Sequence, residues 1–317
     1  MIDKHNREID YLRISLTDKC NLRCIYCMPQ DIQTDNINNE LSFEDYKTIL
    51  KVFSTTGIKK VRFTGGEPLL YKDLDKLIEY ARTDCKIEDI CMTTNAIGLS
   101  NQIRNLKDRG LKKVNISIDS LNEEKYKKIT RGGDLNQVLD ALDRCIELGI
   151  EVKINCVLIE GLNDDELYNF INITKDKTID VRFIELMPIG EGLKVFKKGY
   201  INLKETLENI DYLKPIKCSE KSVASYYKID SSKGRVGIIT PMSCSFCSNC
   251  NRIRMTSNGN LKLCLHSSEE IDIKSYLKDK EKFLGVIKEF IYKKPEKHNL
   301  IENKKSDTHR GMYQIGG

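Results

Sequence analysis

Three cysteines lie close together in residues 20–27, with three and then two residues between them. This spacing lets three thiols converge from a single loop on one metal centre. Three thiolates leave one iron of a four-iron cluster open to a ligand that is not protein, whereas a structural zinc site closes its shell with four protein ligands. The alternatives are a zinc site completed from elsewhere and simple burial of the thiols as small hydrophobic groups. The run therefore predicts a metal-binding loop early in the chain.

A second group of thiols lies near the C-terminus, at Cys247, Cys250 and Cys264. Residues 256–260 predict a hairpin turn that returns Cys264 to the Cys-x2-Cys pair. On spacing alone, a zinc ribbon with Cys244 or His266 as its fourth ligand and a second three-thiolate cluster remain equally open. The arginines of residues 252–254 follow the pair at a spacing that points both to the same side of a strand.

The composition is that of an ordinary globular protein, with 40% hydrophobic and 31% charged residues in a chain of 317. No stretch approaches the roughly 20 apolar residues of a membrane span. The first eight residues are charged, so we expect no secretory signal and a cytoplasmic protein without a membrane partner. Twelve cysteines are too sparse for a disulfide scaffold. The net charge of +5 is modest and no basic run is interleaved with aromatics, so we expect no nucleic-acid partner.

Strands and helices are predicted to alternate through the first two thirds of the chain. The predicted strands are 11–16, 61–63, 90–93, 114–118, 152–157 and 181–184, and the predicted helices are 42–57, 74–81, 102–108, 123–129, 135–148 and 165–175. Strict alternation predicts an α/β fold with a parallel sheet, and six β/α units suffice for a partial barrel.

Most of the unusual residues follow the carboxyl half of a predicted strand, where β/α barrels build their sites. These residues are 20–27, 65–68, 93–95, 117–120, 153–155 and 185–187. Motifs that are far apart in sequence are therefore expected to be neighbours on one face of the barrel.

The pattern changes after about residue 190. We expect a loop at 190–198, a helix at 202–210, short strands within 222–240 and a solvated lysine-rich loop at 293–305. The chain is accordingly divided into a barrel domain, residues 1–199, and a smaller α+β domain, residues 200–317.

Two resemblances follow from these motifs. The cysteine spacing with Tyr26 between the last two thiols resembles the signature of the radical S-adenosylmethionine (SAM) superfamily. The chain also resembles the GTP 3′,8-cyclase family over essentially its whole length. This second resemblance rests on the same signature together with residues 65–68 (Gly-Gly-Glu-Pro), the second cysteine group with its arginines and the ending Ile315-Gly316-Gly317. That family catalyses the first step of molybdenum cofactor biosynthesis. The resemblance implies a partial six-unit (β/α) barrel of the radical SAM type and a C-terminal α+β domain carrying a second iron–sulfur cluster.

The resemblance also implies roles for individual residues. Cys20, Cys24 and Cys27 would hold a 4Fe-4S cluster that binds SAM, with contacts to SAM from Tyr26, Gly66, Ser117 and Met187. Cys247, Cys250 and Cys264 would hold a second 4Fe-4S cluster, whose open iron binds the guanine of GTP. The implied GTP ligands are Arg13, Arg62, Thr93, Lys153, Arg252, Ile253 and Arg254. Gly316 and Gly317 are implied to reach into the barrel and assist SAM cleavage. Cys244 lies outside this ligand set and would close the open iron if it became a fourth ligand.

The implied reaction is that of a lyase converting GTP to (8S)-3′,8-cyclo-7,8-dihydroguanosine 5′-triphosphate. The implied partners are GTP, a reductant protein of the flavodoxin or ferredoxin type and a downstream cyclic pyranopterin monophosphate synthase; a homodimer is compatible with the sequence. The alternative is a peptide-modifying radical SAM enzyme with an auxiliary cluster. Such an enzyme would need neither the paired arginines nor the diglycine end.

Overall fold

A twelve-stranded sheet dominates the fold. The computed structural model describes residues 1–33, 40–217, 223–243 and 246–316, and its strands follow the order β12-β11-β10-β1-β2-β3-β4-β5-β6-β9-β8-β7. The central strands are β1 (Tyr11–Ser15), β2 (Lys60–Thr64), β3 (Asp89–Thr94), β4 (Lys113–Ser117), β5 (Glu151–Leu158) and β6 (Asp180–Glu185). All neighbours among these six strands pair in parallel, which confirms the predicted α/β class with its parallel sheet.

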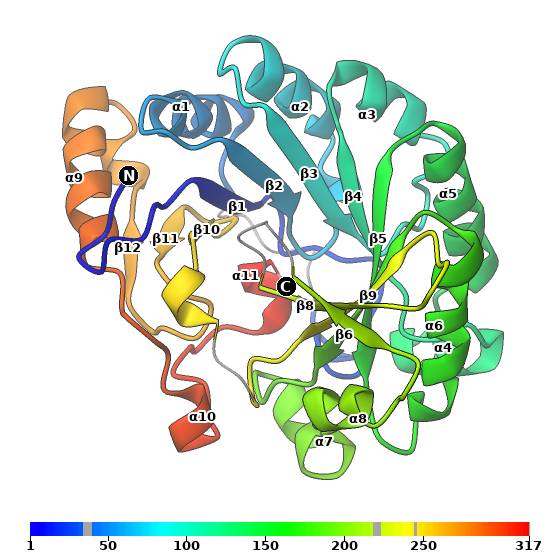
Figure 1. Cartoon of the computed structure of the whole chain (residues 1–317). Helices are drawn as coiled ribbons and strands as arrows, with labels where there is room; N and C mark the ends of the chain where they lie inside the picture. The colour runs from blue at the N-terminus through cyan, green and yellow to red at the C-terminus, as the bar shows by residue number, and fades with distance from the viewer. Residues whose placement is uncertain (34–39, 218–222, 244–245, 317) are drawn as a thin grey trace.

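Helices connect the central strands and cover the outer face of the curved sheet (Figure 1). They are α1 (Phe43–Ser54), α2 (Leu74–Thr83), α3 (Ile103–Arg109), α4 (Glu123–Thr130), α5 (Leu135–Glu147) and α6 (Leu167–Asp176). The start of α1 is fixed by a capping box. Ser42 Oγ accepts a hydrogen bond from the Asp45 amide, and the Asp45 carboxylate accepts one from the Ser42 amide. No helix of the described residues is long and apolar enough to cross a membrane.

C-terminal strands extend the sheet at both edges. On one side β9 (Arg235–Ile239) runs parallel to β6 and is followed outward by β8 (Ser225–Lys228) and β7 (Lys214–Ile216). On the other, β10 (Arg252–Met255) runs parallel to β1 and is followed by β11 (Asn260–Lys262) and β12 (Glu270–Asp272). The antiparallel pairing of β10 and β11 confirms the predicted hairpin. The division at residue 199 stays a prediction.

The remaining helices are short, apart from α9. They are α7 (Gly192–Gly199), α8 (Leu203–Glu208), α9 (Lys280–Tyr292), α10 (Leu300–Asn303) and α11 (Met312–Ile315). Figure 1 shows α9 outside the barrel beside α1 and α11 inside the curve of the sheet, close to the C-terminus. Residues 312–315 therefore lie within the barrel.

The predicted loop at 190–198 is wrong, and the predicted solvated loop at 293–305 is wrong at Lys294 and at α10. Residues 190–198 mostly form α7, where Phe196 packs on Tyr200 with ring centroids 5.1 Å apart, an i,i+4 contact that offsets the helix-weakening glycines. In the lysine-rich segment, Lys294 is only 2% exposed. Its ammonium donates hydrogen bonds to the backbone carbonyls of Arg252 (2.8 Å) and Leu263, so this lysine stabilises the β10–β11 hairpin.

The interface between α6 and β6 predicts a large stability effect. Phe170 is fully buried and packs edge-to-face on Phe183, with ring centroids 6.1 Å apart. We expect Phe170→Ala to lower the free energy of unfolding by about 3–5 kcal/mol, because the deletion leaves a cavity in the core. The control Tyr168→Ala alters a 54% exposed side chain on the same helix and should change that free energy by less than about 0.5 kcal/mol. Urea denaturation followed by circular dichroism measures both; equal effects would contradict the assigned core.

Candidate active site

The first cysteine group lies in the loop after β1. Burial, followed by the neighbouring charges of Cys20 and Asp119, raises the pKa of Cys27 to about 12. Burial likewise raises the pKa of Cys24, with added contributions from Asp119, Cys27 and Cys20. Three half-buried thiols that disfavour one another's ionisation fit a cationic centre that holds all three as thiolates.

The residues that follow β2 pack directly on this loop. The Gly66 amide donates a hydrogen bond to the carbonyl of Thr17 (2.6 Å). A Cβ at position 66 would lie 2.2 Å from the Lys19 carbonyl oxygen, so only glycine permits this crossing of two backbones. Glu67 then joins the loop to β3, because its carboxylate accepts hydrogen bonds from Thr94 Oγ1 (2.6 Å) and the Asn95 amide (2.8 Å).

A buried carboxylate fixes the aromatic residue of the cysteine loop. Tyr26 donates a hydrogen bond to Asp119 Oδ2 (2.6 Å), and Asp119 Oδ1 accepts one from the Val157 amide (2.8 Å). Burial raises the pKa of Asp119 to about 6. A Cβ on Gly192 would contact the carbonyls of both Met187 and Tyr26, so these two predicted SAM residues lie near each other. Asp119, two residues after Ser117, was not among the predicted site residues.

The second cysteine group lies where β10 begins and where the β10–β11 hairpin returns. Burial raises the pKa of Cys264 against the opposing charge of Lys294, with smaller contributions from Cys250 and Cys247, so the three thiols are close enough to interact electrostatically. Although burial also acts on Cys250, the charges of Lys294 and Arg252 lower its pKa overall. Cys244 and Gly317, both named in the sequence predictions, lie outside the described residues.

Neither cysteine group has the shape of a single-ion site. Among the residues that the structure describes, no three His, Cys, Asp or Glu side chains are arranged to hold one metal ion. The fit of each group to a cluster therefore rests on its three mutually interacting thiols and, for the second group, on the cavity beside them.

A cavity of about 240 Å³ lies inside the barrel next to the second cysteine group. All three of these cysteines and most of the predicted GTP residues line it. Other lining residues are Tyr11, Lys60, Lys113, Asn115, Glu151, Asn155, Arg182, Met187, His266 and His298. The cavity is therefore strongly cationic, which suits a polyanionic ligand.

Strand register gathers the cations. Arg254 of β10, Arg13 of β1 and Arg62 of β2 are directly paired neighbours on three adjacent parallel strands, so their side chains form one layer. Arg62 donates hydrogen bonds to the Met92 carbonyl (2.8 Å) and to Thr93 Oγ1 (3.3 Å), which brings two predicted GTP residues together. Burial, then Arg252, lowers the pKa of Arg254 to about 10. Ile253 alternates with the arginines and is fully buried away from the cavity lining.

Tyr11 lies among these guanidinium groups. Its hydroxyl accepts a hydrogen bond from Arg62 Nε (2.6 Å), and the Arg252 guanidinium lies 5.5 Å from its ring centroid. Burial alone would raise the pKa of Tyr11, but the charges of Arg62, Arg13 and Arg252 lower it to about 8. The phenol is thus an acidic group within a cationic wall.

Several buried polar atoms of the cavity residues find no partner within the described part of the chain. They are Asn115 Oδ1, Arg182 Nε, Arg252 Nε and His298 Nε2. Leaving such a group unpaired costs about 1–3 kcal/mol, so their concentration here indicates a cavity shaped for a polar ligand.

The structure also corrects one sequence placement. Lys153 is the third residue of β5, near the amino end of that strand rather than in its carboxyl half. It still lines the cavity and forms an ion pair with Asp180 (3.1 Å). Sequence reasoning missed Arg182, whose signal was a charged residue in the middle of an apolar strand, at a position aligned with Asn155.

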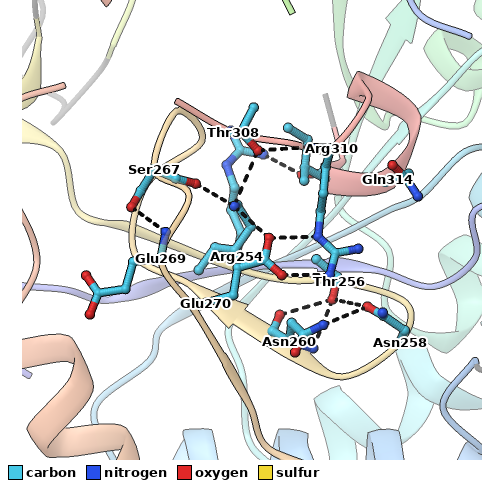
Figure 2. A network of polar contacts seen from close by, with 12 residues as sticks. Arg254, Thr256, Asn258, Asn260, Ser267, Glu269, Glu270, Thr308, Arg310 and Gln314 are labelled. Carbon is cyan, nitrogen blue, oxygen red and sulfur yellow. Dashed lines mark hydrogen bonds and ion pairs between the residues drawn. The ribbon is translucent and has the colours of Figure 1, made fainter. Parts of the chain in front are cut away.

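The C-terminal tail enters the same space. Arg254 Nη1 donates hydrogen bonds to the carbonyls of Ile315 (3.0 Å) and Gly316 (2.6 Å). Gly316 has a φ of +65°, and a Cβ there would lie 2.5 Å from Thr64 Cγ2 at the end of β2. Position 316 therefore requires glycine, both for its backbone conformation and for the close approach to the strand. Figure 2 shows the polar network that surrounds Arg254 and the tail residues Thr308, Arg310 and Gln314.

Comparison with known proteins agrees with this geometry. The family model of the Radical SAM superfamily matches residues 14–173, and that of Molybdenum Cofactor Synthesis C matches residues 179–300. Among curated relatives, a GTP 3′,8-cyclase of Clostridium botulinum is 50% identical over 319 residues and one of Clostridium acetobutylicum is 48% identical over 318 residues. Both alignments cover 100% of this chain and 100% of the relative.

Solved structures show the same fold at low sequence identity. The crystal structure of Streptococcus suis SuiB matches with a TM-score of 0.62 and 16% identity, covering 98% of this chain and 78% of that chain. SuiB bound to S-adenosylmethionine matches with a TM-score of 0.57 and 18% identity, covering 98% and 77%. These matches confirm the radical SAM fold. With full-length relatives near 50% identity and both family models in order along the sequence, this chain belongs to the GTP 3′,8-cyclase family of the radical SAM superfamily.

Proposed function

We propose that this protein converts GTP to (8S)-3′,8-cyclo-7,8-dihydroguanosine 5′-triphosphate, the lyase reaction that begins molybdenum cofactor biosynthesis. The observation that carries the proposal is the cavity in which a three-thiol group and a layer of arginines face the same space. A triphosphate needs several cations, and guanidinium groups bind phosphate oxygens in pairs.

We assign the two ends of the site to different ligands. Cys20, Cys24 and Cys27 hold the 4Fe-4S cluster that binds SAM, near Tyr26, Gly66, Ser117 and Met187. Cys247, Cys250 and Cys264 hold a second 4Fe-4S cluster beside the guanine of GTP. When bound, SAM and its reduced cluster supply the 5′-deoxyadenosyl radical that removes hydrogen from ribose C3′.

The chain's own residues bind and orient the substrate. Arg13, Arg62 and Arg254 are aligned across three strands and neutralise the triphosphate, with Arg252, Lys153 and Thr93 around them. Gly316 lies at the end of β2, where a side chain has no room. We propose that Gly316 and Gly317 assist SAM cleavage. The enclosed position of the cavity excludes water from the reacting carbon.

The reaction balances with two external electrons and one proton, because one electron is consumed in the reductive cleavage of SAM to methionine and the other completes the cyclised purine. Loss of hydrogen from C3′ and formation of the C3′–C8 bond leave the purine one electron and one proton short of the dihydro product. We propose a flavodoxin- or ferredoxin-type protein as the electron source and a cyclic pyranopterin monophosphate synthase as the consumer of the product. The alternative of a peptide-modifying enzyme has less support, because the cationic layer has no role in that chemistry.

Anaerobic turnover tests the proposal directly. Reconstituted protein is incubated with SAM, dithionite and GTP, and the mixture is analysed by mass spectrometry. We expect 5′-deoxyadenosine together with a chromatographically distinct isomer of GTP. Deoxyadenosine without change in GTP would refute the substrate, and its absence from protein with full iron content would refute the radical chemistry.

The second cysteine group predicts a specific iron content. Wild-type protein should hold about eight irons per chain after reconstitution, and Cys264→Ala about four, because two thiolates do not retain the second cluster. The control Cys145→Ala removes a buried thiol from α5, outside both groups, and should keep about eight irons. Elemental analysis measures the iron and zinc content, and electron paramagnetic resonance detects the reduced clusters. One zinc per chain in the wild type would instead indicate a zinc ribbon.

The acidic phenol of Tyr11 predicts how GTP affinity depends on pH. Because the pKa of Tyr11 is about 8, raising the pH from 7 to 9 adds a negative charge to the cationic layer. A bound triphosphate raises this pKa, so affinity falls as pH rises, by up to about tenfold per unit above pH 8. Equilibrium dialysis of GTP at several pH values measures the effect, and Tyr11→Phe should remove it. Ionisations of GTP itself affect both proteins equally, so the same slope in the variant would contradict the prediction.

A further inference from the structure

The C-terminal tail has an anchor other than the arginine layer. Arg254 holds the carbonyls of Ile315 and Gly316, yet Arg254 is also one of the proposed triphosphate ligands. A phosphate oxygen is a stronger hydrogen-bond acceptor than a peptide carbonyl. If Arg254 alone held the tail, bound GTP would compete for it and release the diglycine end from the site where it is needed.

The second anchor is an ion cluster built on Glu270. Arg310 of the tail binds its carboxylate through two hydrogen bonds, from Nε (2.7 Å) and Nη2 (2.6 Å). The same carboxylate accepts a hydrogen bond from Lys262 Nζ (2.8 Å), the residue paired with Glu270 between β11 and β12. Figure 2 shows Arg310 extended towards Glu270 beside the hairpin.

The cluster is largely shielded from water, so its charged groups interact with one another rather than with solvent. The Lys262 side chain is fully buried, and those of Glu270 and Arg310 are 19% and 17% exposed. Lys262 Nζ also donates to the Ser267 carbonyl (2.6 Å). Burial acts against ionisation of Glu270, but Arg310 and Lys262 lower its pKa overall, so one carboxylate remains charged between two cations. A bidentate guanidinium–carboxylate contact of this kind also fixes orientation.

A third contact links the tail to the first cysteine loop. Gln314 Nε2 donates to Asp18 Oδ2 (3.4 Å), and Asp18 Oδ1 accepts a hydrogen bond from Ser257 Oγ (2.6 Å) in the hairpin turn. Asp18 is two residues before Cys20. The tail is thereby held between the β10–β11–β12 hairpin and the loop of the first cysteine group.

We propose that Glu270 is a positioning residue that keeps the diglycine tail docked while GTP occupies Arg254. Its ion pair with Arg310 carries the tail, so that Arg254 is free to exchange peptide carbonyls for phosphate. The proposal rests on the proposed function, since it assumes that GTP reaches Arg254 and that the tail assists the reaction. Neither Glu270 nor Arg310 touches the cavity.

Amide hydrogen exchange of the tail tests the proposal. Wild type, Glu270→Gln and Arg310→Gln are compared as reconstituted proteins, with and without GTP and in the absence of SAM and reductant. The control Arg144→Gln removes an Arg–Glu pair of 2.9 Å on the outside of the barrel. Arg310→Gln lies in the tail itself, so it tests the same pair even if Glu270→Gln fails to fold.

GTP should distinguish the variants from the wild type. We expect exchange protection of residues 308–316 to fall by about tenfold or more when GTP is added to Glu270→Gln or Arg310→Gln, and to stay unchanged in wild type and Arg144→Gln. A peptide from α2 serves as the internal reference, because none of the substitutions lies in that helix. In turnover, kcat should fall by about tenfold in the two variants while the KM for GTP stays within about twofold. A general loss of structure would instead lower protection in α2.

Three outcomes would overturn the proposal. In the first, GTP releases the tail equally in wild type, which would make Arg254 the main anchor. In the second, the variants keep the tail protected with GTP bound. In the third, kcat is unchanged although the tail is released. Equilibrium dialysis separates these outcomes from failure of the proposed function. If wild type does not bind GTP, that function fails, and an Arg254→Gln background then decides about the anchor without any ligand. Glu270→Gln should lower tail protection in that background, and equal protection with and without Glu270→Gln would refute the anchor.

Discussion

Buried positive charge is the constraint on which the interior of the barrel depends. Arg254, Arg13 and Arg62 are aligned on adjacent strands, and Arg182 faces the same cavity. Burial, followed by the charge of Arg254, lowers the pKa of Arg13, so the neighbouring guanidinium groups disfavour ionisation at the centre of the layer. Placing several like charges in a poorly solvated space costs free energy that packing alone does not offset. The arrangement makes physical sense as a site that reaches its most stable state with a polyanion bound.

The neutral and acidic groups around the arginine layer lower the free-energy cost of burying its charges, and the layer keeps its positive charge. Tyr11 accepts a hydrogen bond from Arg62, and backbone carbonyls of β3 and of the tail accept others. Asp180 pairs with both Lys153 and Arg235, so part of the cationic wall is already neutralised. The protein thus keeps its guanidinium groups oriented in the absence of ligand and leaves their remaining donors for phosphate. Preorganised donors of this kind lower the cost of binding.

Local patterns in the sequence predicted the six parallel units and the metal-binding loops, because hydrophobic periodicity and cysteine spacing are local properties. The pairing of β10 with β1 could not be predicted in this way. Register between strands about 240 residues apart depends on the whole fold, and it is this register that places Arg254 beside Arg13. Arg182 was missed for the same reason: only its alignment with Asn155 shows that it faces inward. Lys294 was predicted to be solvated because its neighbours are polar, but tertiary contacts beneath the hairpin bury it.

The two cysteine groups lie at opposite ends of the same short strands, and this sets what the site can do. The first group follows the carboxyl end of β1, whereas Cys250 lies just before β10, whose first residue pairs with Tyr11 at the amino end of β1. A strand of five residues spans only about 16 Å, so the ends of β1 at which the two groups lie are only about that far apart. In the proposed function, the arginine layer between the two ends binds the triphosphate of the nucleotide. Gly316 packs against Thr64 at the carboxyl end of β2, on the side of the first cysteine group, and leaves no room for a side chain there.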